Sequence, residues 1–126
     1  MSVYSNTQIK EAIKTGHIVF HPYQENHIAG SSVDVTLGHY FYKQEYQDEA
    51  RIYNPFDPTE VDRYFKGPLE AMPHKEWCEK NNQPLFANIP EDHPIIVLRP
   101  HERILAHTHE FIGIKAPGTS TMQARS

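Results

Sequence analysis

The chain is poor in several features that define whole classes of protein. Its one cysteine, Cys78, cannot form an intrachain disulfide, which fits a reducing compartment. No segment approaches the roughly 20 apolar residues of a transmembrane helix, and residues 1–5 lack the basic start and apolar run of a signal peptide. We therefore expect a cytoplasmic protein that does not insert into membranes.

Basic clusters are also missing. Lys and Arg are scattered along the chain. There are 12 of them against 16 Asp and Glu, which gives a formal net charge of −4 with the nine histidines counted neutral. Proteins that bind nucleic-acid polymers draw much of their affinity from many cation–phosphate contacts. We therefore expect no binding to such a polymer, although a few local donors could still hold a small anion.

Aromatic residues and proline are well represented. The 126 residues include seven Tyr, six Phe and ten Pro, with a hydrophobic share of 38%. This aromatic content is too high for a disordered chain, and this much proline favours strands and loops over a helix bundle. We expect a single domain over residues 1–126 with a mainly β fold.

One helix is predicted near the start of the chain. Ser5 and Gln8 have the spacing of a capping box, in which each side chain bonds the other residue's backbone N–H. Apolar residues then recur on one helical face, and Gly16 tolerates the left-handed conformation that ends many helices. These signals predict a helix over residues 6–15.

Several short strands are predicted on either side of a polar middle region. Val33, Val35 and Leu37 alternate with polar residues, which is typical of a half-buried strand, and Gly38 is expected to break it. By similar patterns we expect strands at residues 17–21, 32–37, 39–42, 95–98, 103–108, 111–114 and 119–125. This spacing is typical of a sandwich or barrel.

Residues 43–94 differ from the rest and are interpreted as a variable insertion or lid on the β scaffold. Asp57, Pro58 and Glu60 predict a helix start, and Gly67-Pro68 is expected to end that helix. A second short helix is expected over residues 74–80. Segments of this kind often cover functional sites.

Two histidine arrangements could contribute metal ligands. His107 and His109 would face the same side of a strand, and His74 and Cys78 would share a helix face. Each arrangement supplies only two ligands, whereas zinc sites use three or four, so hydrogen-bonded or surface side chains are the favoured reading. The signature of zinc deaminases, with its two cysteines, is absent.

Four residues are candidates on their own chemistry. Cys78 has two acidic neighbours, which disfavour a nucleophilic thiolate, so a passive thiol is favoured. Asp34 is expected on the polar face of its strand, exposed or paired with a donor. Arg125 and Ser126 combine a guanidinium fork with a hydroxyl, which suits anion binding, although a polar chain end is the simpler explanation.

Taken in order, three segments resemble the motifs of dCTP deaminases, a family within the dUTPase superfamily. The segments are Gly-Ser-Ser-Val-Asp-Val-Thr-Leu-Gly at 30–38, the stretch 98–112, which follows the pattern L-x-P-G-x-x-x-L-x-x-T-x-E-x-I, and 122–126, which resembles the start of a G-R-S-S phosphate-binding motif. The opening at 16–22 also matches. Thr36 stands where Arg is common, and His101 and Ala124 each stand where Gly is common.

The resemblance implies a distorted β-barrel, jelly-roll-like fold of dUTPase type with an N-terminal helix and a helical insertion, incomplete at the C-terminus. It also implies a homotrimer with sites between subunits, and a deoxynucleoside triphosphate (dCTP, dUTP or dTTP) carrying Mg²⁺ on its phosphates, with no zinc. By position, Arg125 and Ser126 would bind the triphosphate, and Asp34 would have a structural role.

The implied reaction is hydrolytic deamination of dCTP to dUTP and ammonia, in pyrimidine deoxynucleotide biosynthesis. In the family the carboxylate that activates water follows the phosphate motif, so no catalytic residue is expected in this chain, and neither Glu102 nor Glu110 matches its position. Alternatives are a dUTPase, a bifunctional deaminase–diphosphatase, and a nucleotide-binding or regulatory relative without catalysis. The products of the reaction would separate them.

Overall fold

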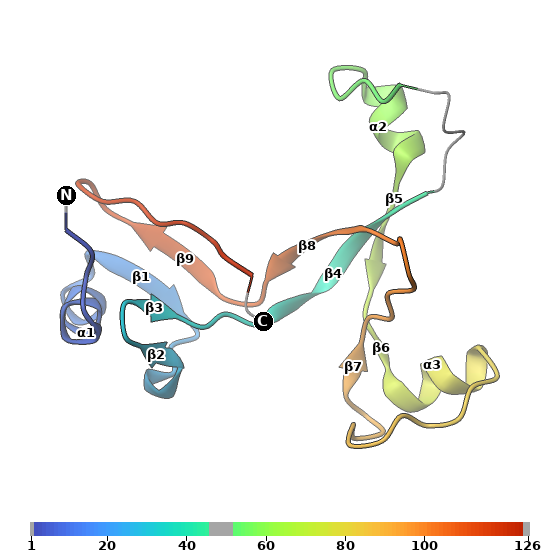
Figure 1. Ribbon diagram of the computed structural model, residues 1–126, viewed down its shortest axis with the longest axis horizontal. Coiled ribbons are helices and arrows are strands. Elements are labelled where there is room, and N and C mark those ends of the chain that lie inside the picture. Colours follow the sequence, from blue (N-terminus) through green and yellow to red (C-terminus); the bar gives the residue numbers. More distant parts are fainter. Residues whose placement is uncertain (1, 46–51, 125–126) are drawn as a thin grey trace. The chain divides into compact units, whose positions relative to one another are not determined.

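The computed structural model describes residues 2–45 and 52–124, which are mainly strands with three α-helices (Figure 1). The helices are α1 (Asn6–Thr15), α2 (Pro58–Tyr64) and α3 (His74–Lys80), with a short 3-10 helix, η1 (Glu25–His27). The strands are β1 (Ile18–His21), β2 (Ile28–Ala29), β3 (Ser32–Val33), β4 (Leu37–Gln44), β5 (Phe65–Glu70), β6 (Met72–Pro73), β7 (Pro94–Ile95), β8 (Ile104–Thr108) and β9 (Phe111–Ile114). The predicted mainly β fold is confirmed, and within the described residues the strands form four small sheets without a closed barrel.

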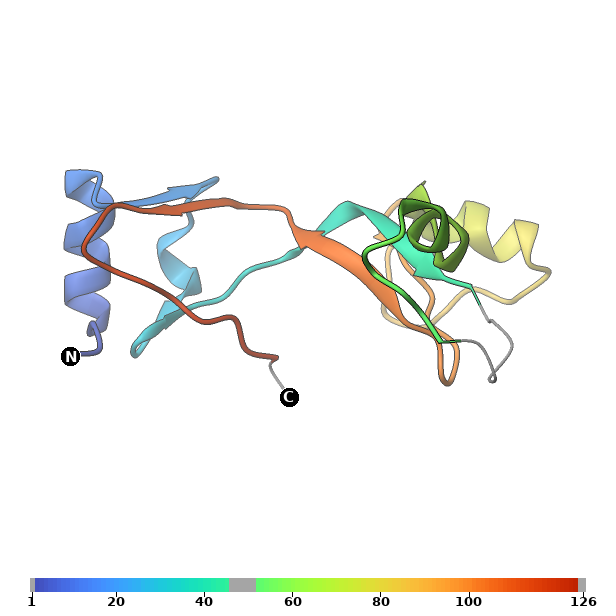
Figure 2. The same cartoon turned by 90° about the horizontal axis from the view of Figure 1, so that it is seen from above.

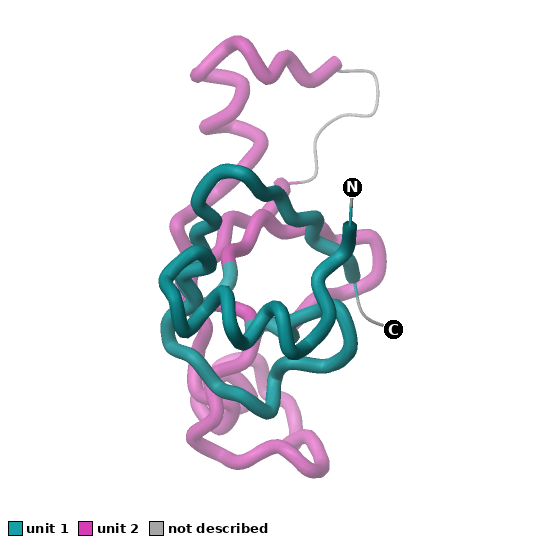
Figure 3. The backbone as a smooth tube through the Cα atoms, turned by 90° about the vertical axis from the view of Figure 1, so that its left-hand side faces the viewer, with its two compact units in different colours: residues 1–36, 108–126 teal, residues 37–107 magenta. Residues whose placement is uncertain are grey.

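The chain divides into two compact units, coloured separately in Figure 3. Unit 1 comprises residues 1–36 and 108–126, and unit 2 comprises residues 37–107. The predicted insertion, residues 43–94, lies inside unit 2. No helix among the described residues has the length and apolar character needed to cross a membrane.

Unit 1 is built on two antiparallel strands that are distant in sequence. β1 pairs with β9, with Ile18 opposite Ile114 and Phe20 opposite Ile112. α1 packs against β1, and the buried apolar side chains of this unit are Ile9, Ala12 and Phe20. After β9 the chain reverses direction and runs back, as Figures 1 and 2 show.

The predicted helix of unit 1 is confirmed at both ends. The Ser5 N–H donates to Gln8 Oε1 over 2.9 Å, and the Gln8 N–H donates to Ser5 Oγ over 3.4 Å. Gly16 adopts the left-handed conformation with φ of 79°, and its N–H donates to the Ile13 carbonyl. These contacts are local in sequence, which is why the pattern alone located the helix.

Unit 2 contains a three-stranded sheet in the order β5-β4-β8. Tyr53, Tyr64 and Phe65 form an aromatic cluster, with the two tyrosine ring centroids 4.5 Å apart. α2 begins as predicted, with the Asp57 carboxylate accepting the Thr59 N–H over 3.0 Å. α3 spans the predicted residues 74–80 and buries His74 and Cys78.

The strand predicted over residues 32–37 is wrong in its middle. β3 ends at Val33 and β4 begins at Leu37, and the backbone N–H of Thr36 between them bonds a side chain instead of a strand. The Asp34 N–H donates to the His27 carbonyl over 2.8 Å, and the Thr36 N–H donates to a side chain. The segment therefore leaves the strand pattern that its alternating side chains suggested.

Gly38 does not break a strand but lies buried inside β4. A Cβ at this position would overlap the imidazole ring of His107, so the absence of a side chain makes room for that ring. The His107 ring also lies parallel to the Tyr40 ring, at 6.3 Å between centroids. Glycine at this position allows the His107 ring to approach the backbone closely. From the sequence alone, such a glycine cannot be told from one that ends a strand.

Three other boundaries differ from the predictions. The helix α2 ends at Tyr64 rather than at Gly67-Pro68, because Phe65 already pairs with Gln44 of β4. Of the strand expected at 95–98, only Ile95 lies in β7 (Pro94–Ile95), which pairs with β6. Within the strand expected at 119–125, the described residues 119–124 form none.

Candidate functional site

Two of the three predicted site residues, Arg125 and Ser126, lie outside the described residues. The third, Asp34, is half-buried, and its N–H donates to the His27 carbonyl over 2.8 Å. Its structural role stays a prediction.

A partly buried side-chain interaction joins two of the segments that carry the family resemblance. The carboxylate of Glu110 accepts three hydrogen bonds from Thr36: the hydroxyl lies 2.7 Å from Oε1, and the backbone N–H lies 3.2 Å from Oε1 and 3.0 Å from Oε2. The backbone N–H of His109 donates to the Thr36 carbonyl over 2.9 Å. We call this set of bonds the Thr36–Glu110 clasp.

Local contacts hold Glu110 in place. Its side chain is 6% exposed, and its carbonyl accepts the Thr108 hydroxyl over 2.7 Å. Burial, the largest single influence, raises the pKa of the Glu110 carboxyl. Hydrogen bonds from the Thr36 hydroxyl, the Thr36 N–H and the backbone of Glu110, together with the charge of His109, lower it. The pKa of Glu110 therefore lies below its ordinary value, and the clasp is made by the charged form.

Acid should weaken the fold through this carboxyl. Because the pKa of Glu110 is lower in the folded chain, the unfolded chain binds more protons near pH 4.5, the ordinary value. The stabilisation is present above that pH and is lost as the pH falls through the lowered pKa. In urea unfolding, the stability gap between wild type and Glu110→Gln should narrow as the pH is lowered from 7 toward 3. A constant gap would contradict this prediction.

Reasoning from the sequence did not find the clasp. Thr36 stands where Arg is common, and Glu110 matches the Glu of the 98–112 pattern but not the catalytic position; neither observation names a partner. The two residues are 74 positions apart, and no pattern within either segment joins them. The one available signal was that both belong to segments of the same family resemblance.

The histidine arrangements do not form metal sites among the described residues. No group of three or more His, Cys, Asp or Glu side chains is placed to hold a metal ion there. His107 Nε2 accepts the Tyr40 N–H over 3.4 Å. In the His74 ring, Nδ1 lies 3.3 Å from the Pro90 carbonyl and Nε2 accepts the Phe86 N–H over 2.8 Å. These contacts agree with the reading of hydrogen-bonded histidines.

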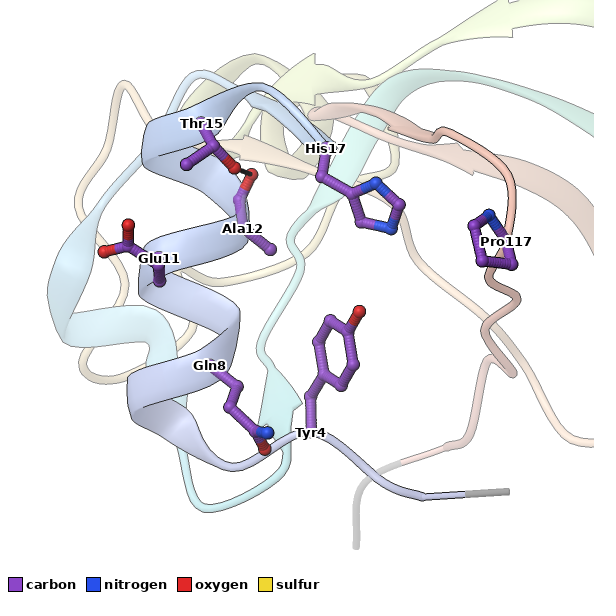
Figure 4. Close-up of a pocket in the computed structure, with 7 residues that line it drawn as sticks. All are labelled: Tyr4, Gln8, Glu11, Ala12, Thr15, His17 and Pro117. Carbon is purple, nitrogen blue, oxygen red and sulfur yellow. Dashed lines mark hydrogen bonds between the residues drawn. The ribbon is translucent and has the colours of Figure 1, made fainter.

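Two open hollows lie on the described surface, one in each unit. The hollow of unit 1, of about 420 Å³, is lined by Tyr4, Gln8, Glu11, Ala12, Thr15, His17 and Pro117 (Figure 4). The hollow of unit 2, of about 350 Å³, is lined by Pro73, Lys75, Glu76, Glu79, Glu91 and Asp92. The first lining includes no Lys or Arg, and in the second Lys75 pairs with Glu91 at 3.3 Å. Neither lining therefore offers the cationic donors that a triphosphate needs.

Comparison with known proteins defines the class and then the family. The mainly β architecture is consistent with the dUTPase type of fold. The family model described as dCTP deaminase-like matches residues 3–126, and the chain belongs to this family. No solved structure matches the chain.

A named relative gives the same indication. The chain is 27% identical to a dCTP deaminase from Ignicoccus hospitalis (strain KIN4/I) over 114 residues, which cover 90% of this chain and 51% of that protein. The chain thus spans about half the length of the relative. Identity at this level supports the family and leaves the reaction of this protein to experiment.

Proposed function

We propose that the protein containing this chain catalyses the hydrolytic deamination of dCTP to dUTP and ammonia. The observation that carries the proposal is the dCTP deaminase-like match, which extends over residues 3–126. The similarity to a dCTP deaminase over 90% of the chain supports it. Within the cell this activity would supply dUTP for deoxynucleotide metabolism.

The binding roles are proposed from motif positions. Arg125 and Ser126 would bind the triphosphate, the guanidinium through paired hydrogen bonds to phosphate oxygens. Mg²⁺ would arrive with the nucleotide and offset phosphate charge, as this ion commonly does. The functional assembly would be a cytoplasmic homotrimer with the sites between subunits.

A carboxylate must activate water in a deamination without zinc. The two glutamates considered for this role are engaged elsewhere. Both oxygens of Glu110 accept hydrogen bonds from Thr36. Glu102 accepts the Arg99 N–H over 2.9 Å and pairs with Lys43 at 2.9 Å. The position of the base, on a strand following the phosphate motif, is proposed from the family resemblance.

Product analysis tests the proposed reaction. Incubation of the protein with dCTP and Mg²⁺ should yield dUTP and ammonia in equal amounts, whereas residues 1–126 expressed alone should release no ammonia.

Arg125→Ala should raise KM for dCTP at least about tenfold, because a charge-assisted phosphate contact is lost. Formation of dUMP and pyrophosphate from dUTP would instead indicate a dUTPase, and dUMP from dCTP a bifunctional enzyme. Tight nucleotide binding without turnover would support a regulatory relative.

A further inference from the structure

A loop of unit 2 closes around one buried histidine. Residues 81–93 run from the end of α3 back along that helix to β7 (Figure 1). At the start of α3, the His74 N–H donates to the His93 carbonyl and the Lys75 N–H donates to the Glu91 carbonyl, each over 2.9 Å. The side chain of His74 is fully buried, and its ring contacts the loop at Phe86 and Pro90.

Both nitrogens of the His74 ring meet backbone atoms of this loop. Nε2 accepts the Phe86 N–H over 2.8 Å, and Nδ1 lies 3.3 Å from the Pro90 carbonyl oxygen. Because an N–H only donates and a carbonyl only accepts, the two contacts require a neutral ring with its hydrogen on Nδ1. The Phe86 ring stacks on this imidazole, with planes 13° apart.

A second proton on the His74 ring is incompatible with the closed loop. It would occupy Nε2 and convert that atom from an acceptor into a donor, which would face the Phe86 N–H. The Phe86 N–H would lose its acceptor, and a positive charge would stand at a position with no exposure to water. Both changes cost free energy, so the ring takes up a proton only when the loop releases it.

The charged groups around His74 lie at the surface. Cys78, on the same helix, is buried, whereas the other titratable side chains of α3 and the loop are exposed: Lys75, Glu76, Glu79, Lys80, Glu91, Asp92 and His93. Lys75 and Glu91 pair at 3.3 Å. The four carboxylates favour a positive charge nearby, but they act through water that screens them, and the ring nitrogens already meet the backbone.

We propose that His74 makes this loop a pH-dependent switch, closed while the ring is neutral and opened when the ring is protonated. An imidazole in water takes up its second proton at about pH 6.5. Since only the open form binds that proton, the stabilisation of the closed loop is present above this pH and is lost as the pH falls below it. The ratio of open to closed loop should therefore rise about tenfold from pH 7.5 to pH 5.5. The switch is independent of the proposed deamination, because its groups lie within residues 74–93.

Hydrogen exchange at the Phe86 amide of the intact protein measures the open fraction, because this N–H donates to the His74 ring. After correction for the intrinsic pH dependence of exchange, its protection should fall about tenfold from pH 7.5 to pH 5.5. The Ile9 amide, which donates to the Ser5 carbonyl in unit 1, is the internal control and should change less than about twofold. Nitrogen-15 NMR should show the His74 ring of the closed form neutral, with its hydrogen on Nδ1.

Two substitutions separate His74 from the other titratable groups. His74→Gln does not titrate in this range, so its Phe86 protection should differ less than about twofold between the two pH values, whatever its absolute stability. His93→Gln, at an exposed histidine of the same loop, should keep the change of about tenfold. The proposal is wrong if wild-type protection at Phe86 stays constant, or if the His74 ring is protonated while Phe86 remains protected. Both outcomes are read on wild type, so they hold even if His74→Gln does not fold. A pH effect that survives in folded His74→Gln would also overturn it.

Discussion

His74→Ala will destabilise unit 2 by about 2–4 kcal/mol, the range expected when a buried side chain is lost together with a hydrogen-bond partner. The His74 ring is fully buried. Its Nε2 accepts the Phe86 N–H over 2.8 Å, and its Nδ1 lies 3.3 Å from the Pro90 carbonyl, so the neutral ring with hydrogen on Nδ1 satisfies both contacts. The ring also stacks on Phe86, with centroids 5.3 Å apart. Alanine would leave a cavity and an unpaired N–H.

The only tryptophan in the chain is a convenient reporter of this change. Trp77 lies on α3, with its ring 5.8 Å from Phe86, so its fluorescence follows unfolding around His74 in urea. His93→Ala is the control, since the His93 side chain is exposed, and it should cost less than about 0.5 kcal/mol. His74→Gln, which can still donate and accept, should fall between the two. Equal urea midpoints for His74→Ala and His93→Ala would contradict the prediction.

Phe20→Ala will destabilise unit 1 by about 3–5 kcal/mol, as for other buried phenylalanines. Phe20 is 7% exposed and lies on β1, against which α1 packs. Ile9 and Ala12 are the other buried apolar residues among the described parts of unit 1, so Phe20 supplies the largest apolar side chain of a small core. Little surrounding structure is available to fill the cavity.

Val19→Ala on the same strand is the matched control. Val19 is 48% exposed, so its truncation should cost less than about 1 kcal/mol. Chemical denaturation followed by far-ultraviolet circular dichroism, with hydrogen exchange at the amides of β1 and β9, measures both variants. Similar losses of protection for Phe20→Ala and Val19→Ala would show that the buried face of β1 is not the core of unit 1.

The accuracy of the sequence predictions follows the range of the contacts involved. α1 was located to the residue because Ser5, Gln8 and Gly16 act within a few positions of one another. The same holds for α2 at its start, where Asp57 caps Thr59. Its end was wrong because Phe65 pairs with Gln44, which lies 21 residues earlier in the chain.

In the candidate site, too, short motifs could be recognised from the sequence, whereas contacts between distant residues could not. Arg125 and Ser126 were proposed from motif resemblance, and their binding role, like Mg²⁺ and the trimer, stays a prediction. The clasp could not be predicted, because neither Thr36 nor Glu110 has a local pattern that names its partner. Distinguishing a buried, hydrogen-bonded carboxylate from a catalytic or exposed one requires knowing its surroundings.

The sequence by itself determined the mainly β class, the two well-placed helices α1 and α3, and the family resemblance that the comparison confirmed. These depend on periodicity, capping and short motifs, which are properties of neighbouring residues. Only the tertiary structure decided that Gly38 makes room for His107 and that Glu110 takes the bonds of Thr36. Both outcomes arise from contacts between residues about 70 positions apart, since packing and burial are set by what the folded chain brings together.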